Sequence, residues 1–466
     1  MFSRKKNNAK SKKRKWSPVL PVLRPNVAGI DIGSKSHFVA GPIPDDESQN
    51  VKEFATTTPQ LNELADWLTD QDVVSVAMES TGVYWIPVYE ILVSRGFEVL
   101  LVNATQISNV PGRKTDVLDC QWIQILHSCG LLRGSFRPDD AICELRALKR
   151  QWSNLVEERT KSVQWMQKSL DQMNVQVHHA VTELTGKTGM SIIRAIIAGE
   201  RDPKKLALNR DKRCKKSVEE IAEHLTGNWR SDHLFNLRMA LQMYDQLLEM
   251  INGYEAELIR KVEELVPPER KGEALPPHPN PMKEKVIKLR GDQEMRQTLW
   301  RFSGVDLTRI DGINVGVAQL VLTEIGLKLD NFPNEKKFVS WLRLSPRHSV
   351  SGGKPLKQKK NSMGATRVAG ALRMAALSLK SSSTALGAYY RKISRRKGAT
   401  VAIFATARKL ATLIFRMLRY GQDYVDIGEE AYEEQFKQNR LAALKSTAMS
   451  LGYKIVPTEE AVQVSG

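Results

Sequence analysis

Apolar residues in the first third of the chain alternate between strand-like and helix-like spacing. Two short β-rich runs, VAGIDIG and HFVAGPI, flank a Gly-Ser-Lys-Ser turn and predict a β-hairpin, which VKEFAT extends by a third strand. An amphipathic stretch over 61–68, the apolar run VVSVAM, a helical pattern over 83–94, the run FEVLLVN and a helix over 116–132 follow. The pattern therefore predicts three antiparallel strands followed by β–α units.

That order of elements is typical of an RNase H-like α/β fold, which we expect over residues 27–132. The first 26 residues precede it as a basic arm that we expect to be flexible, with eight Lys and Arg among the first sixteen residues. The bland alternative for the arm is a solubilising tail.

The spacing becomes purely helical over 142–266. Two series of apolar residues recur three and four apart, one at Leu145, Leu148, Trp152, Leu155, Val163, Met166, Leu170, Met173 and Val177, the other at Leu234, Leu237, Leu241, Tyr244, Leu248, Ile251, Leu258, Val262 and Leu265. Two long helices with such stripes predict an antiparallel coiled coil or a dimerising stalk. A simple helical bundle is the alternative.

The last part of the chain begins after a cluster of prolines. Six prolines between 267 and 281 predict a linker or exposed loop over 267–285. A second compact and mostly helical region is expected over 300–425, with a C-terminal extension over 426–466. The expected fold class is thus α/β plus α, in agreement with a length of 466 residues, beyond the size of a single core.

Charge narrows the class of partner. The chain has 70 Lys and Arg against 52 Asp and Glu, a formal charge of +18, which favours nucleic acid as the partner and an anionic membrane as second choice. The most apolar stretch, 401–415, contains Arg408 and Lys409, so we expect no membrane span. Four cysteines without a CxxC pair and no secretory signal predict a cytoplasmic, nucleoid-associated protein.

Four acidic residues of the first domain are placed to meet. Asp31 lies in the first strand between Gly29 and Gly33, where a backbone or substrate can approach closely, and Glu79 ends the VVSVAM strand. Asp116 and Asp119 are three apart on the following helix and share one face. Converging carboxylates are tolerated when a divalent cation neutralises them, and their oxygens favour Mg²⁺ or Mn²⁺. Four unrelated surface acids are the equally weighted alternative.

A glycine-containing turn and a serine loop stand out in the second domain. The segment 310–318 is similar to a helix-hairpin-helix turn that offers backbone N–H groups to phosphate, with Gly312 in the turn. Asn314 replaces the usual second glycine, and Asn tolerates the left-handed conformation expected there. Ser351 precedes two glycines in a loop rich in cationic side chains, namely Arg347, His348, Lys354, Lys357, Lys359 and Lys360. These could offset phosphate charge around a nucleophilic serine, although a phosphate grip without covalent chemistry is the simpler interpretation.

Together these motifs resemble the DEDD transposases of insertion sequences, over roughly residues 27–420. The motifs are GIDIGSKSH, AMESTGVYW, GRKTDVLDCQWIQILHSCGLL, IDGINVGVAQLVLTEIG, LSPRHSVSGG and a helix with Gly364 and Arg367. The resemblance implies a RuvC-like domain whose Asp31, Glu79, Asp116 and Asp119 bind Mg²⁺. It also implies a serine domain whose Ser351 forms a transient phosphoserine link to DNA, and a structured bridge RNA that selects donor and target DNA by base pairing.

The resemblance further implies assembly as a dimer or tetramer through the helical region. Nucleic-acid contacts are expected from Arg113 and Lys114, from the Gly312 turn, and from Arg347, His348, Lys354, Lys357 and Arg367. The chain departs from the family pattern in its basic arm, its Pro-rich stretch, its C-terminal extension and its Arg-Leu-Ser-Pro before the serine loop. Ser349 lies two residues from Ser351 and is a rival nucleophile.

The leading functional hypothesis is therefore an RNA-guided DNA transposase or recombinase that excises and inserts its element. The first alternative is a Mg²⁺-dependent RNase H-like junction or strand nuclease without a covalent intermediate. The second is a nucleic-acid-binding protein without enzymatic activity.

Deletion of residues 1–16 tests the role of the basic arm. Removing eight cationic residues should weaken nucleic-acid binding and reduce its dependence on salt, because fewer counterions are released on binding. The measurement is a duplex-binding isotherm at several salt concentrations. Unchanged affinity and salt dependence would assign the arm to solubility alone.

Overall fold

In a computed structural model of the chain, the structure describes residues 21–42, 51–80, 82–107, 116–214, 216–345, 350–351, 354–355, 366–421, 423–424 and 426–455. The chain divides into two compact units, residues 1–137 and 138–466. Each unit is considered by itself below.

The first unit is built on a five-stranded sheet in the order β3-β2-β1-β4-β5. The strands are β1 (Val27–Ile32), β2 (Ser36–Ala40), β3 (Val51–Ala55), β4 (Ser75–Glu79) and β5 (Glu98–Val102). The first three pair antiparallel, whereas β1–β4 and β4–β5 pair parallel. The predicted hairpin, third strand and β–α units are confirmed, and the sheet is compatible with the expected RuvC-like domain.

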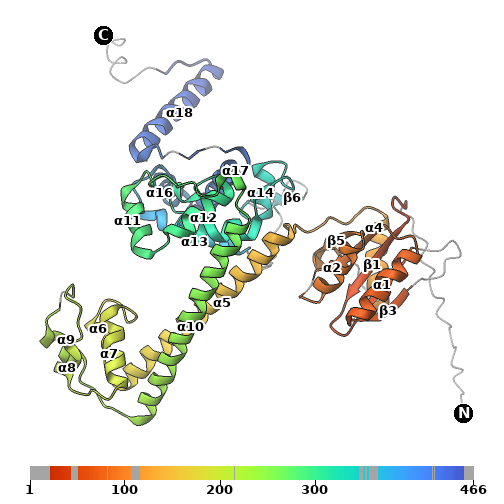
Figure 1. Ribbon diagram of the computed structural model, residues 1–466. Coiled ribbons are helices and arrows are strands. Elements are labelled where there is room, and N and C mark those ends of the chain that lie inside the picture. Colours follow the sequence, from red (N-terminus) through yellow and green to blue (C-terminus); the bar gives the residue numbers. More distant parts are fainter. Residues whose placement is uncertain are drawn as a thin grey trace, which may run out of the picture. The chain divides into compact units, whose positions relative to one another are not determined.

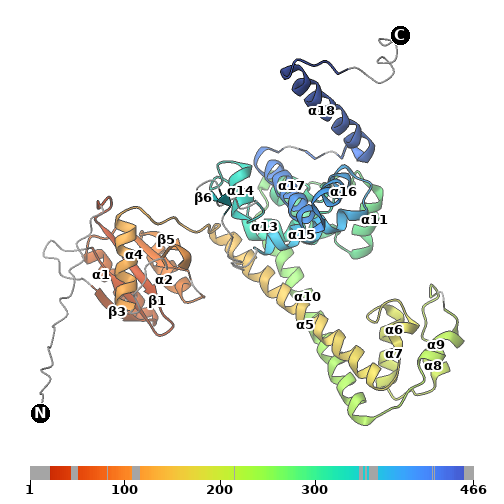
Figure 2. The same cartoon turned by 180° about the vertical axis from the view of Figure 1, so that it is seen from behind.

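Helices cover both faces of this sheet (Figures 1 and 2). On one face, α1 (Thr58–Asp70) and α2 (Trp85–Ser94) bury leucines and valines against Ile30, Val39 and Met78. On the other face, α4 (Asp116–Ser128) packs across β1, and its Ile123 joins a small cluster with Ala77 and Val102. A short helix, α3 (Ala104–Ile107), follows β5.

Two long helices form the spine of the second unit. They are α5 (Asp140–Gln172) and α10 (Ser231–Glu264), which pack side by side within one chain and run in opposite directions (Figure 1). The two predicted helices are therefore present, whereas a regular coiled coil and a stalk that dimerises remain predictions.

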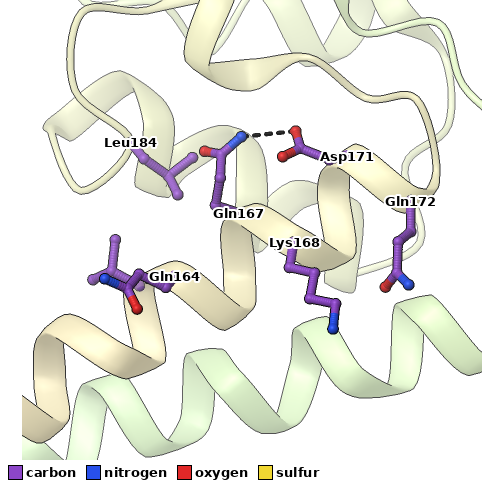
Figure 3. A pocket seen from close by; sticks show the side chains of 7 residues that line it. Gln164, Gln167, Lys168, Asp171, Gln172 and Leu184 are labelled. Atoms are coloured by element: carbon purple, nitrogen blue, oxygen red, sulfur yellow. Dashed lines mark hydrogen bonds between the residues drawn. The ribbon is translucent and has the colours of Figure 1, made fainter.

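A small helical module joins the far ends of the two long helices, and we call residues 175–229 the tip module. It contains α6 (Val177–Ala180), α7 (Lys187–Ile197), α8 (Pro203–Ala207) and α9 (Val218–His224). Isoleucines and leucines of these helices share one core with Met166 and Leu170 of α5 and Leu237 of α10. Beside this junction lies a shallow pocket in which Gln167 donates a hydrogen bond to Asp171 at 2.8 Å (Figure 3).

The remaining elements of the second unit are almost all helical. They are η1 (Pro268–Arg270), α11 (Pro281–Arg290), α12 (Gln293–Ser303), η2 (Leu307–Arg309), α13 (Val315–Ile325), α14 (Glu335–Trp341), β6 (Val350–Ser351), β7 (Lys354–Pro355), α15 (Arg367–Ser378), η3 (Leu379–Ser381), α16 (Ala385–Lys397), α17 (Ala399–Tyr420) and α18 (Gly428–Ser450). None of the helices within the described ranges is long and apolar enough to span a membrane.

The Pro-rich stretch is mostly exposed over 271–280, as expected for a loop, but one of its residues is buried and its end is helical. His278 is buried, its Nε2 lies 3.1 Å from the carbonyl oxygen of Thr308, and its Nδ1 accepts a hydrogen bond from the Asn280 amide. Asn280 then caps α11, which begins at Pro281 inside the expected linker. The prolines therefore precede a helix rather than separate two bodies, because Pro is well suited to the first turn of a helix.

A buried polar network fastens the spine to the C-terminal helices. Arg150 of α5 binds both carboxylate oxygens of Glu324 in α13, at 2.8 and 2.7 Å, and Arg146 contacts the same carboxylate at 3.3 Å. The residue before Arg150, the buried Lys149, donates to the side chain of Gln319 and lies over the ring of Trp152. Burial lowers the pKa of Lys149 to about 8.

The stability of this junction should depend on pH through Lys149. Its pKa is depressed in the folded protein, so between pH 8 and 10.5 the unfolded chain binds the extra proton and stability rises with pH. Compared with Lys149→Met, the wild type should gain on the order of 3 kcal/mol of unfolding free energy over that range. Denaturant unfolding at several pH values measures it.

Lys161→Met is the matched control on the same helix, since Lys161 is exposed and paired with Glu158. The difference in unfolding free energy between Lys161→Met and the wild type should stay constant between pH 8 and 10.5. A constant difference for Lys149→Met as well would show that Lys149 stays charged in the folded protein throughout.

Candidate active site

Asp31 and Glu79 stand at the same edge of the sheet. Strands β1 and β4 are parallel neighbours with Gly29 opposite Ala77 and Ile30 opposite Met78, so the next residue along each strand is Asp31 and Glu79. Glu79 is in turn opposite Val102 of β5, and the amide of Ser80 donates to the Val102 carbonyl oxygen at 3.1 Å. The carboxyl ends of parallel strands are the edge at which α/β sheets bind ligands.

Both side chains belong to the face that α4 covers. Side chains along a strand alternate between faces, so Asp31 shares a face with Gly29, and Glu79 with Ala77. Gly29 lies under the backbone of α4, and Ala77 packs with Ile123 of that helix. The two carboxylates therefore project beside α4 rather than toward α1 and α2.

Gly29 allows α4 to lie unusually close to the sheet. A Cβ atom at this position would come within 2.3 Å of the Gln124 nitrogen and 2.4 Å of the Cys120 carbonyl oxygen. Backbone atoms cannot yield at such distances, so any side chain at residue 29 would push the helix away. The sequence predicted that a backbone or a substrate approaches closely at this glycine. In the structure, the backbone of α4 makes that approach. Gly33 instead allows the carbonyl oxygen of Ser36 to close the β1–β2 turn.

Asp119 reaches the same region from α4. The neighbouring residue, Cys120, is buried, and the pKa of its thiol is raised to about 12, mainly by burial and then by the negative charges of Asp31 and Asp119. Strand register therefore places Asp31 and Glu79 at one edge of the sheet, and Asp119 lies on the helix that covers the same face.

The far end of α4 is fixed by buried polar contacts that the sequence motifs did not reveal. The Ser75 hydroxyl and the His127 Nε2 atom lie 2.9 Å apart, and both residues are buried. Burial lowers the pKa of His127, which favours its neutral form. The Gln124 side chain donates to the Val27 carbonyl oxygen at 3.4 Å. The one signal in the sequence that could have suggested the Ser75–His127 contact is that one residue belongs to a predicted strand and the other to a predicted helix.

Asp31, Glu79 and Asp119 offer carboxylate oxygens, which are the ligands that Mg²⁺ and Mn²⁺ prefer. Asp116 begins α4, one turn before Asp119, but its side chain lies outside the described part of the structure. Among the side chains that the structure describes, no group of three or more His, Cys, Asp and Glu is arranged to hold a metal ion.

The serine loop of the second unit is described only in part. Ser351 ends the short strand β6, where it is opposite Lys354 of β7 in a two-stranded antiparallel hairpin. The side chains of Ser351 and Lys354 lie outside the described residues, as do Arg347, His348, Ser349, Lys357, Lys359 and Lys360 in full. Arg113 and Lys114 of the first unit also lie outside them. Arg367 is the first residue of α15 and is exposed.

In the turn before α13, the backbone conformation expected from the sequence is confirmed at Gly312 and wrong at Asn314. Gly312 has the expected positive φ of 85°, and a Cβ there would meet the Ala375 carbonyl oxygen of α15 at 3.0 Å. Asn314 has φ −100°, so its expected left-handed conformation is wrong. Its side chain instead accepts a hydrogen bond from the Val317 amide at 2.8 Å and caps α13. Asn suits both turns and helix N-caps because its short side chain can form hydrogen bonds with the nearby backbone.

Comparison with protein families gives two matches. The transposase family of DEDD type from IS110 elements matches residues 28–175, and the transposase IS116/IS110/IS902 family matches residues 304–391. Together they cover about half of the chain and contain, respectively, the carboxylate edge and the serine loop. No curated protein matches the chain.

The fold and the two matches define a DNA transposase or recombinase, an enzyme that acts on DNA phosphodiesters. More particularly, the chain carries the DEDD domain and the C-terminal domain of IS110-family transposases. The DEDD family implies dependence on a divalent metal ion, and the enzyme class implies DNA as partner.

Gly29→Ala tests the contact that places α4. The added methyl group meets backbone atoms, so we expect a loss of about 1–3 kcal/mol in unfolding free energy and faster hydrogen exchange in α4. Chemical denaturation with hydrogen-exchange mass spectrometry measures both. The control is Gly253→Ala in α10, where no atom lies within 4 Å of the new methyl group. That change should stabilise by about 0.5–1 kcal/mol. Equal stability of Gly29→Ala and wild type would mean that α4 lies farther from β1.

Proposed function

We propose that the protein is an RNA-guided DNA transposase that combines a metal-binding carboxylate cluster with a serine nucleophile. The observation that carries the proposal is the position of Asp31 and Glu79 at one sheet edge of the DEDD domain, on the face that is covered by the helix carrying Asp119. The same chain holds Ser351 near the tip of a hairpin in the second matched domain. One chain thus contains both reactive groups that the proposed reaction needs.

The carboxylates have the role of metal ligands. Asp31, Glu79 and Asp119, with Asp116 one turn earlier on α4, would hold Mg²⁺ or Mn²⁺. A bound ion of this kind stabilises negative charge on the oxygens of a phosphodiester under attack. The residues themselves fix the geometry of the site: two come from neighbouring strands, and Asp119 comes from a helix whose distance to the sheet is set at Gly29.

Ser351 has the role of nucleophile. Its Oγ atom forms an ester bond to a DNA phosphorus, and one existing phosphorus–oxygen bond of the backbone breaks. The serine hydroxyl loses a proton and the departing DNA oxygen gains one, so protons balance. Cationic side chains expected around the loop, such as Arg347 and Lys354, would offset the phosphate charge. A second exchange by a DNA hydroxyl then releases the serine.

A structured noncoding RNA has the role of guide. The support is the resemblance to bridge-RNA-dependent transposases together with a charge of +18 on the chain. Base pairing with the RNA would select donor and target DNA, while the protein contacts backbone and shape. Assembly as a dimer or tetramer would bring the carboxylate and serine halves of different copies together.

Reconstitution tests the proposal directly. Purified protein with the noncoding RNA that flanks its gene and a donor–target DNA pair should give recombinant product and a covalent protein–DNA adduct on a denaturing gel. Ser351→Ala should abolish the adduct, whereas the matched control Ser349→Ala should retain it. An adduct that persists in Ser351→Ala overturns the serine assignment, and recombination without added RNA overturns the guide.

A second candidate, a metal-dependent strand nuclease, is favoured by one observation. Asp31, Glu79 and Asp119 all belong to the first unit, which is compact by itself. Such an enzyme would give hydroxyl-ended products without an adduct in the same assay. Asp31→Asn should abolish cleavage under either function, so the adduct distinguishes them.

A further inference from the structure

The tip module lies outside the parts of the chain that the family comparisons explain. Its residues 176–229 fall between the two matched segments, 28–175 and 304–391. It sits at the end of the α5–α10 pair opposite the C-terminal helices (Figures 1 and 2). From Arg150, which binds α13, to its end at Gln172, α5 rises about 33 Å, roughly one turn of B-DNA.

One face of this module carries a dense set of cations. Between Lys204 and Arg213, ten residues contain five cationic side chains and a single acid. All five are exposed, and we call them the basic tip surface: Lys204, Lys205, Arg210, Lys212 and Arg213. They belong to α8 and to the loop that leads from it toward α9.

The loop is folded rather than extended. Arg210 donates to the Lys216 carbonyl oxygen at 2.9 Å, which closes the loop on itself. The Asp211 amide donates to the Thr188 hydroxyl oxygen at 2.9 Å, which ties the loop to the first turn of α7. Below it, Leu206 and Ala207 of α8 are buried in the core of the module. The backbone that carries the cationic side chains is therefore fixed by hydrogen bonds and by the core of the module.

Nearby acids are engaged in holding this structure. Glu200 accepts the amides of Arg201 and Asp202 at 2.9 and 2.8 Å, and Asp202 caps α8 through the Lys204 amide. Asp211 binds the amide and the guanidinium of Arg213, both at 3.0 Å, and pairs with Lys187. Within the described part of the module, Lys204, Lys205 and Lys212 form no ion pair. Three cations thus remain available to an external anion.

The composition of the surface favours the backbone of duplex DNA over unpaired bases. Trp229 is the only Trp, Tyr or Phe between 175 and 229, and the guanidinium of Arg201 lies 4.9 Å from its ring centroid. Single-stranded nucleic acid is commonly bound by exposed aromatic rings that stack on bases, and the five residues of the basic tip surface include none. The exposed rings of the module are those of His178 and His179, which lie outside that surface. Lysines contact phosphates without stacking.

We propose that the basic tip surface binds the phosphate backbone of double-stranded DNA, about one helical turn away from the C-terminal helices. It would extend the DNA footprint of the enzyme along the spine and add affinity that does not depend on base sequence. The inference needs DNA as the substrate, but neither the metal cluster nor Ser351.

The test is a triple variant, Lys204→Gln with Lys205→Gln and Lys212→Gln, in the full-length protein. Binding to a random-sequence 40-base-pair duplex is measured by fluorescence anisotropy between 50 and 200 mM salt in EDTA, so that catalysis plays no part. Loss of three phosphate contacts should lower the slope of log affinity against log salt by about 2 to 3 in magnitude. Affinity at 100 mM salt should fall about tenfold, and the footprint, measured as the shortest duplex bound with full affinity, should shorten by roughly 10 base pairs.

A matched variant controls for net charge. Lys437→Gln with Lys445→Gln and Lys454→Gln removes three exposed lysines on and after α18 and should keep the wild-type footprint. Equal slopes and footprints for the tip variant and the wild type would overturn the proposal. It would equally be overturned if the tip variant lost affinity for a 40-nucleotide single-stranded RNA and kept its affinity for the duplex, since the occupant would then be RNA.

Discussion

The backbone of α4 lies directly on Gly29 of β1, and the carboxylate edge depends on that contact. Because residue 29 has no side chain, the Cys120 carbonyl oxygen and the Gln124 amide nitrogen can occupy space that a Cβ atom at residue 29 would need. Asp31 is two residues further along the strand and Asp119 is next to Cys120 on the helix. The same close approach therefore sets how far the helix that carries Asp119 lies from the strand that carries Asp31, and parallel register places Glu79 at the same end of the sheet. The Ser75–His127 contact fixes the other end of α4.

The second unit is organised by an equally small set of contacts. Glu324 binds Arg146 and Arg150, which joins the long helix α5 to α13, in the domain that also carries the serine loop. At its other end α5 shares a core with the tip module. One helix thus connects α13 with a proposed DNA-binding surface, and the distance between these two follows from the rise of an α-helix.

Much of the first domain could be predicted from sequence because its signals are local. Alternating apolar residues and a Gly-Ser-Lys-Ser turn predict the hairpin. The short apolar run VVSVAM predicts a buried strand, and Glu79 directly follows that run. Contacts between distant segments were not predictable in the same way. The glycines around Asp31 indicated a close approach but not its partner, α4. Asn314 suited either a turn or a helix cap, and packing decided for the cap. His278 lies among prolines that suggested an exposed linker, yet the Thr308 carbonyl oxygen gives it a buried partner.

The central claim is that Asp31, Glu79 and Asp119 form one metal site beneath the N-terminal half of α4. Its most direct measurement is an anomalous difference map from crystals of the full-length protein soaked in Mn²⁺. We expect one strong peak within coordination distance of carboxylate oxygens from all three residues, with Asp116 as a further ligand. A map with Mn²⁺ bound elsewhere, or with no peak at the edge formed by β1 and β4, would contradict the claim.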